Sequence, residues 1–156
     1  LSPGEGSPVP EAEALIYAAS RAQLMAKVIE PSLAKGIVVI CDRFVDSSLA
    51  YQGYARGLGI EEVLKINQFF LKDRWPDLTL LLDLDPAVSL ARRRPGTRDR
   101  LEMEALNFHR QVRRGFHEIA DMFSDRVKIV DANRDEDSIF IDILLEIKKS
   151  GIMNMQ

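Results

Sequence analysis

Three short apolar runs divide this chain, and stretches with helical periodicity separate them. The runs are GIVVICD, LTLLLDLD and RVKIVDA, which occupy residues 36–42, 78–85 and 126–132. Continuous apolar runs of this length are typical of strands that are buried on both faces of a sheet. Because strands that alternate with helices form parallel sheets, the sequence predicts an α/β fold of three layers, with helices on both faces of the sheet.

The helical pattern is clearest between about residues 11 and 29, where apolar residues recur at spacings of three and four. Pro31 should interrupt or kink that helix, because proline has no backbone N–H. Another helix should follow Pro86, and the remaining helices are predicted at about 46–54, 60–71, 101–122 and 135–149. With 156 residues, the chain is long enough for a single domain with one sizeable core.

Charged residues stand where each apolar run ends. Asp42 and Arg43 follow the first run, Asp83 and Asp85 close the second, and Asp131 closes the third. In open parallel sheets, ligands bind beyond the carboxyl ends of the strands. The sequence therefore predicts that these residues face a ligand site.

Composition limits the partners that such a site could serve. The formal net charge of −3 gives no overall positive field for nucleic acid. No apolar run approaches the roughly 18 residues of a membrane span, so we expect neither nucleic acid nor membrane as a partner. The only cysteine, Cys41, lies in an apolar run, which predicts a buried thiol in a reducing cytoplasm. Neither His109 nor His117 has the spacing of a metal ligand.

Tyr17 and Arg21 are four residues apart in the first predicted helix, so they share a face of it. An aromatic ring and a guanidinium on one face could stack on a planar base and bond its edge. The alternative is a surface tyrosine with a cation–π partner, and the spacing alone does not decide between the two.

Asp42 and Arg43 begin a second polar group. A guanidinium presents a planar fork of donors that suits phosphate, and a carboxylate can hold a water of a Mg²⁺ shell. The alternative is a simple ion pair that closes a strand. Two further pairs at helical spacing could line one wall of a pocket, namely Ser47 with Tyr51 and Ser48 with Gln52.

Five arginines fall within the nine positions 92–100, interrupted by Pro95 and Gly96. A loop with this much positive charge suits a lid that closes over polyphosphate. A nucleic-acid patch would require interleaved aromatic residues, which this segment lacks. A solvated charged turn is the remaining alternative.

Taken together, these segments resemble the thymidylate kinase family, whose members are P-loop enzymes that transfer the γ-phosphate of ATP to dTMP. The helix that stacks on the base resembles EALIYAASRAQL, and the family's aspartate–arginine segment with its following helix resembles GIVVICDRFVDSSLAYQG. The fourth strand resembles PDLTLLLDLDP, and the loop beside the adenine resembles VDANRDEDSI. The lid, at about 91–101, and the helix after it resemble ARRRPGTRDRLE and FHRQVRRGF. The resemblance extends from about Glu11 to Ile147.

Two motifs of the family do not occur in residues 1–156. The family begins with a strand and a G-x-x-x-x-G-K-[ST] phosphate loop, followed by a second strand with an Arg-Glu-Pro motif. The resemblance therefore implies a P-loop kinase fold whose first two strands are absent from this chain. We expect three strands of five, a gap in the core, and no kinase activity from these residues alone.

The resemblance also implies roles for individual residues. Tyr17 would stack on thymine and Arg21 would bond its edge carbonyl. Arg43 would bind the acceptor phosphate, and Asp42 would lie near Mg²⁺, holding it through water.

Further roles follow from the same resemblance. Ser48 and Gln52 would face the remaining base edge, and Tyr51 would pack beside the deoxyribose. Asn133 would lie by the adenine of ATP. The lid candidates are Arg94 and Arg98.

The implied reaction is in-line phosphoryl transfer from ATP to dTMP, with Mg²⁺ and no covalent protein intermediate. The expected assembly is a homodimer in the cytoplasm. A second interpretation stays open, namely a non-catalytic nucleotide-binding or interaction module that has lost the phosphate loop.

Overall fold

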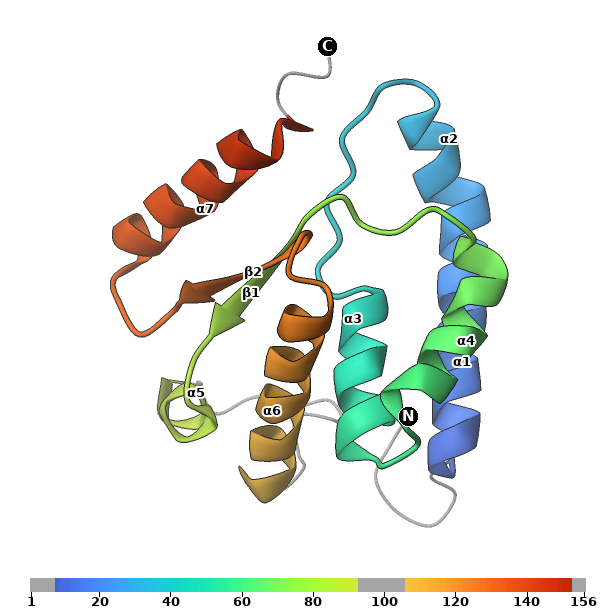
Figure 1. Ribbon diagram of the computed structural model, residues 1–156, viewed down its shortest axis with the longest axis horizontal. Helices are drawn as coiled ribbons and strands as arrows, with labels where there is room; N and C mark the ends of the chain where they lie inside the picture. Colours follow the sequence, from blue (N-terminus) through green and yellow to red (C-terminus); the bar gives the residue numbers. More distant parts are fainter. Residues whose placement is uncertain (1–7, 93–105, 153–156) are drawn as a thin grey trace. The chain divides into compact units, whose positions relative to one another are not determined.

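The computed structural model describes residues 8–92 and 106–152, which belong to two compact units. The helical unit is Pro8–Trp75, and the sheet unit is described over residues 76–92 and 106–152 (Figure 1). The organisation as a single domain stays a prediction. Among the helices of these ranges, none is both long and apolar enough to cross a membrane.

The helical unit consists of helices joined by loops. Its elements are α1 (Pro10–Leu24), the π-helical η1 (Met25–Ile29), α2 (Glu30–Leu33), α3 (Val45–Ser48), the π-helical η2 (Leu49–Ala55) and α4 (Ile60–Leu71). The helices predicted at 11–29, 46–54 and 60–71 are therefore confirmed. Single π-helical turns occur frequently at functional sites, and η2 contains two of the predicted binding residues, Tyr51 and Gln52.

Proline marks both ends of the long first helical stretch. Pro10 occupies the first turn of α1, where its missing N–H would have no helical partner in any case. The interruption predicted at Pro31 takes the form of the π-helical η1, after which α2 begins with Pro31 in its first turn. Proline is tolerated in a first turn, so the chain continues in nearly the same helical path.

The core of the helical unit lies where η1, α3 and α4 meet. Four buried residues form its centre, and four partly buried residues surround them: Met25, Ile29, Val45 and Leu71, then Val39, Phe44, Phe70 and Trp75. α1 also packs against α3, η2 and α4. Its contact face carries the small buried residues Ala14 and Ala18, which let the neighbouring helices approach closely.

Residues 36–42 do not form the strand that the sequence predicts. They have no regular secondary structure, and no strand in the described part of the chain pairs with them. Ile37, Val38 and Ile40 are 52%, 59% and 92% exposed. A strand is stabilised by hydrogen bonds to a neighbour and by burial of its faces. Here the strand partner is missing, and within the segment only Val39 is partly buried. The prediction of a buried Cys41 thiol is wrong for the same reason, because Cys41 is exposed.

The sheet unit contains the two other predicted strands. β1 (Thr79–Asp83) and β2 (Val127–Asp131) run parallel, with Thr79 beside Val127 and Asp83 beside Asp131. The remaining elements are α5 (Pro86–Arg92), α6 (Leu106–Met122) and α7 (Glu136–Ser150). Residues 101–105 of the helix predicted at 101–122 lie outside the described residues. The α/β class with a parallel sheet is confirmed.

Helices cover both faces of this small sheet. α6 and α7 both pack on β2. The side chain of Asp83 contacts α6, whereas the adjacent Leu82 lines a cavity together with α7. Because successive side chains of a strand point to opposite faces, α6 and α7 lie on opposite faces of β1 and β2. The predicted three-layer arrangement is thus present in this unit.

Candidate functional site

One face of α1 carries a stripe of polar and aromatic side chains. Glu13, Tyr17 and Arg21 are four residues apart and therefore follow one another along that face. Glu13 is 1% exposed and Arg21 is 9% exposed. The Cζ atom of Arg21 lies 5.9 Å from the centroid of the Tyr17 ring. The two residues predicted to share a face are brought together, and the guanidinium is buried instead of solvated.

Neutral acceptors hold the buried guanidinium of Arg21 in one orientation. Its Nη1 donates to Oδ1 of Asn67 at 2.8 Å, and its Nη2 donates to Oγ of Ser48. Burial lowers the pKa of Arg21 to about 10, although Tyr17 and Asp46 act in the opposite direction. A guanidinium has five N–H donors, so two used within the unit leave others for a ligand.

A second buried pair joins η2 to the start of α1. Nε2 of Gln52 donates to Oε1 of Glu13 at 2.8 Å, and both side chains are about 1% exposed. The Nε atom of Arg56 lies 3.6 Å from the same carboxylate oxygen. A buried charge requires a partner, and Glu13 has both a hydrogen-bond donor and a cation beside it.

Arg43, which the sequence predicts to bind phosphate, is exposed and lies in the helical unit. Its backbone φ is +67°, in the left-handed region that non-glycine residues rarely adopt. The Cζ atom lies 4.4 Å from the centroid of the Tyr51 ring, and Nε approaches Oγ of Ser47 at 3.4 Å. Within the described residues it makes no ion pair with Asp42, so the alternative of a simple ion pair is not what forms here.

Asp42 is exposed, directly before Arg43. The described ranges hold no group of three His, Cys, Asp or Glu residues that could bind a metal ion. Mg²⁺ usually keeps several waters and uses one or two carboxylates together with substrate phosphates. One exposed carboxylate fits that mode, whereas a cage built only from protein ligands does not fit the described residues.

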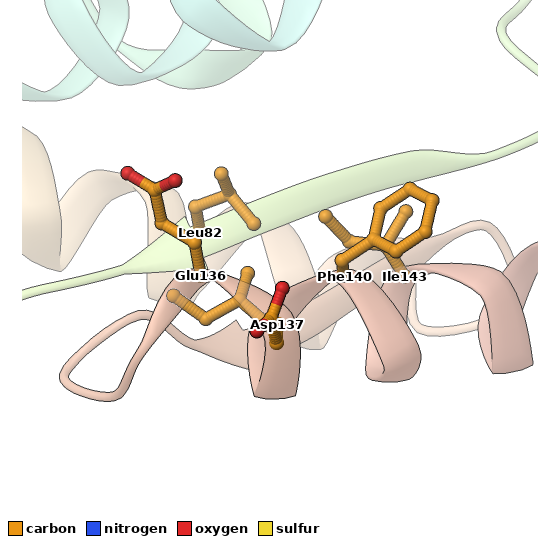
Figure 2. A pocket seen from close by; sticks show the side chains of 6 residues that line it. Leu82, Glu136, Asp137, Phe140 and Ile143 are labelled. Atoms are coloured by element: carbon orange, nitrogen blue, oxygen red, sulfur yellow. The ribbon is translucent and has the colours of Figure 1, made fainter.

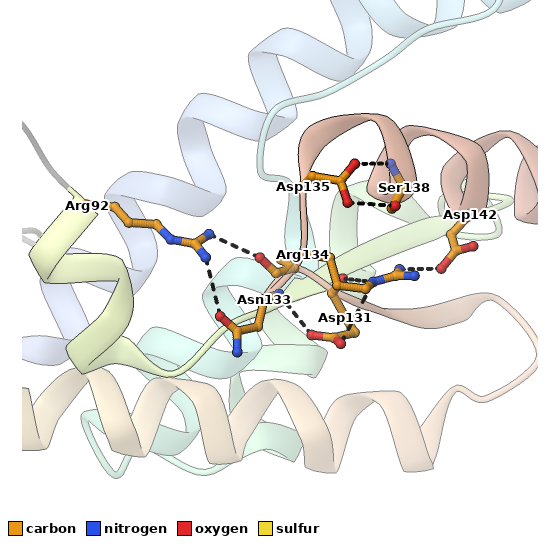
Figure 3. A network of polar contacts seen from close by, with 8 residues as sticks. Arg92, Asp131, Asn133, Arg134, Asp135, Ser138 and Asp142 are labelled. Carbon is orange, nitrogen blue, oxygen red and sulfur yellow. Dashed lines mark hydrogen bonds and ion pairs between the residues drawn. The ribbon is translucent and has the colours of Figure 1, made fainter.

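Asn133 follows β2 in the sheet unit and belongs to a polar network (Figure 3). Arg92 donates to the backbone oxygen of Ala132 at 3.1 Å and to Oδ1 of Asn133 at 3.3 Å. The backbone N–H of Asn133 donates to Oδ1 of Asp131 at 2.9 Å. Arg134 also contacts Asp131. These contacts hold the turn after β2 in place.

The end of β1 carries a charge cluster that the sequence identified only in part. Arg113 on α6 binds both carboxylate oxygens of Asp83, each at 2.7 Å, and lies 3.7 Å from Asp85. His117 Nε2 lies 3.1 Å from the same carboxylate of Asp83. The guanidinium lowers the pKa of Asp83 more than partial burial raises it, and His117 lowers it further. This cluster ties β1 to α6.

A cavity of about 450 Å³ lies between β1 and α7 (Figure 2). Apolar side chains form most of its wall, including Leu82 from the strand and Phe140 and Ile143 from the helix. Glu136 and Asp137 stand at the start of α7. None of the binding residues predicted from the sequence lines this cavity.

Arg94 and Arg98, the two lid candidates, lie outside the described residues, as does most of the segment 91–101. The sequence did not identify Glu13, Arg56 and Asn67, which complete the buried networks around Arg21 and Gln52. A signal for Glu13 existed, because it precedes Tyr17 by four residues on the same helix. Asn67 had none, since its contact with Arg21 spans 46 positions.

Comparisons with known proteins agree with this arrangement. The family model described as Thymidylate kinase matches residues 4–143. The thymidylate kinase of Halalkalibacterium halodurans is 48% identical over 143 residues, which are 90% of this chain and 68% of that protein. The thymidylate kinase of Lactobacillus delbrueckii is 52% identical over 138 residues, covering 86% of this chain and 65% of that protein.

A solved structure, the thymidylate kinase from Ehrlichia chaffeensis, superposes with a TM-score of 0.73 at 27% identity. The match covers 92% of this chain and 68% of that one. The chain spans 62% of the length of a further relative, the thymidylate kinase of a Geobacillus species, at 50% identity. The match runs through α1, η2, both strands and α6, and on this evidence the chain belongs to the thymidylate kinase family.

Proposed function

We propose that this chain carries the acceptor-binding and lid portion of a dTMP kinase, which transfers the γ-phosphate of ATP to dTMP and gives dTDP. One observation carries the proposal. The guanidinium of Arg21 is buried beside the Tyr17 ring and is fixed by two neutral acceptors, Asn67 and Ser48. A fixed donor beside an aromatic ring is the arrangement that a planar base with an edge carbonyl requires.

Thymine should be preferred over cytosine at this position. Tyr17 can stack on any base, but Arg21 only donates, so it suits the carbonyl of thymine and not the exocyclic amine of cytosine. An unpaired amine should cost on the order of 1–3 kcal/mol. Equal affinity of the protein for dTMP and dCMP would contradict the proposal.

The same helical unit offers a place for the sugar and the phosphate. Tyr51 would pack against the deoxyribose, and Arg43, which lies over its ring, would bind the acceptor phosphate. Ser47 Oγ lies beside Nε of Arg43 and would keep the guanidinium directed to that phosphate. Asp42 would hold Mg²⁺ through water, and the ion would neutralise charge on the phosphates when bound.

The residues proposed for ATP lie in the sheet unit and the lid. Asn133 would lie beside the adenine, and the bonds from Arg92 and to Asp131 would hold it in position. Arg94 and Arg98 remain proposals for the lid. A homodimer in the cytoplasm remains the proposed assembly.

The test compares two proteins, the product of the complete reading frame that contains this chain and the fragment of residues 1–156. ADP release is measured with dTMP and Mg·ATP. We expect turnover by the complete protein and none by the fragment, because residues 1–156 contain no G-x-x-x-x-G-K-[ST] loop to hold the β- and γ-phosphates.

Two results would change this conclusion. Robust turnover by the fragment would show that the phosphate loop is dispensable. A complete protein that binds dTMP without releasing ADP would instead favour a non-catalytic nucleotide-binding module.

A further inference from the structure

We propose that Glu13 is a positioning residue for base specificity, because it fixes the amide of Gln52 with its carbonyl oxygen turned to the base. The proposal rests on the proposed function, since it assumes that the base of a nucleoside monophosphate binds beside Tyr17 and Arg21. It adds a residue that touches no substrate atom, and it explains how a neutral amide can read one base only.

The argument begins with the chemistry of an amide. A glutamine side chain has a donor end, Nε2, and an acceptor end, Oε1, and a rotation of 180° exchanges them at little cost. A free glutamine can therefore bind either an N–H or a lone pair of a ligand. It becomes selective only when a neighbour accepts one orientation and refuses the other.

Glu13 is such a neighbour. Its Oε1 accepts from Nε2 of Gln52 at 2.8 Å, and an ionised carboxylate has no proton with which to satisfy Oε1 of the amide in the flipped orientation. Both side chains are about 1% exposed, so water cannot replace the lost bond. Nε2 is the end of the Gln52 amide that Glu13 binds, so Oε1 is the end that the pair can present to a ligand as an acceptor.

Arg56 keeps the carboxylate in place. Its Nε lies 3.6 Å from Oε1 of Glu13, and its side chain is 17% exposed, so the cation is partly buried with the carboxylate it pairs with. Arg56 directly follows the last residue of η2, whereas Gln52 lies in the middle of that element. Glu13 thus connects two points of η2 to the first turn of α1.

The consequence concerns position 3 of the pyrimidine. Thymine carries an N–H there, which can donate to a fixed Oε1, whereas cytosine carries a lone pair that Oε1 would repel. Arg21 reads the neighbouring position in the complementary sense, because it donates to the carbonyl of thymine. Gln52, held by Glu13, would only accept, and Arg21 only donates. Together they would recognise a ring N–H beside a carbonyl, an arrangement that thymine has and cytosine lacks.

The test uses the complete protein and the variant Glu13→Gln. Glutamine at position 13 can donate as well as accept, so both orientations of the Gln52 amide become possible. We expect the preference for dTMP over dCMP, measured as the ratio of dissociation constants, to fall about tenfold, the value of one hydrogen bond. Glu11→Gln is the matched control, because Glu11 lies in the same first turn of α1 and is exposed; its ratio should not change.

The double variant Glu13→Gln/Gln52→Glu separates positioning from folding. It exchanges the carboxylate and the amide, so position 52 again presents only an acceptor, and we expect it to restore the preference for dTMP. If Glu13→Gln does not fold, the double variant decides: a retained preference supports the proposal, and a lost one overturns it.

Three results would overturn the proposal. They are an unchanged ratio in Glu13→Gln, an equal weakening of both nucleotides, which indicates a structural role only, and a double variant that remains unselective. If the unmodified protein prefers dTMP and Glu13→Gln keeps that preference, only this inference is contradicted, and the proposed function stands. An unmodified protein that binds neither nucleotide contradicts the proposed function and the inference with it.

Discussion

Replacing Asn67 by leucine should both destabilise the helical unit and lower the proposed affinity for dTMP. Asn67 is 0% exposed, accepts from Arg21 at 2.8 Å and donates to the backbone oxygen of Val63 at 2.7 Å. Leucine has the same number and branching of side-chain heavy atoms, so none of the cost comes from a cavity. The main cost is a buried guanidinium that loses an acceptor, and a hydrogen bond to a charged group contributes about 1.5–3 kcal/mol. The oxygen of Val63 keeps its helical partner and adds less.

Urea unfolding of the complete protein measures this effect. With a slope of about 1–3 kcal/mol per molar urea, a loss of about 2 kcal/mol moves the midpoint by about 1 M. Asn67→Asp is the matched control, because it keeps an acceptor for Arg21 and should recover part of the loss in stability and in dTMP affinity. A leucine variant whose midpoint and dTMP affinity both stay unchanged would refute the idea that Asn67 holds Arg21.

Three other substitutions test separate parts of the structure. Gly53→Ala should lower the free energy of unfolding by about 1–3 kcal/mol, because the added Cβ would lie 3.0 Å from the backbone of α4. Gly57→Ala has open space around its Cβ and should lower it only by the roughly 1 kcal/mol of a left-handed backbone. Thermal melting compares the two variants. Arg113 lowers the pKa of Asp83 in the folded protein. The Asp83–Arg113 pair therefore contributes its full stability above pH 3.8, the ordinary pKa of the carboxyl, and this contribution is lost as the pH falls through the lower pKa of the folded state. Unfolding in Asp83→Asn should therefore depend less on pH in that acidic window, and an equally steep dependence would argue against the pair. Arg43→Ala should reduce phosphoryl transfer without moving the urea midpoint, since the side chain is exposed, and normal turnover would remove Arg43 from the phosphate site.

Local periodicity predicted which side chains of the candidate site share a helix face. A spacing of four residues places Tyr17 and Arg21 on one face of any α-helix, whatever that face contacts. The same spacing places Ser48 and Gln52 on one face, and both are buried beside α1. What periodicity could not show is which distant side chain meets that face, and Asn67 is such a partner.

Composition predicted the strands less well, and residues 36–42 show why. Their apolar character is as strong as that of the run that contains β2, yet Ile40 is 92% exposed while Val130 is 3% exposed. Val130 lies in a strand with a parallel neighbour and a helix on each side. An apolar run indicates that a segment favours burial, but a strand also needs a partner for its N–H and C=O groups, and a single sequence does not name that partner.

The two arginines of the candidate site differ in a way that suits two different tasks. Arg21 is 9% exposed and bound by neutral acceptors, so its orientation is set before any ligand arrives. A preorganised donor loses little entropy on binding and rejects a misplaced partner strongly, which favours recognition of a base. Arg43 is exposed, and its φ of +67° costs about 1 kcal/mol in an L-residue. Backbone strain of this kind is kept where the surrounding structure needs it. The exposed guanidinium over Tyr51 can still turn toward the acceptor phosphate that we propose for it.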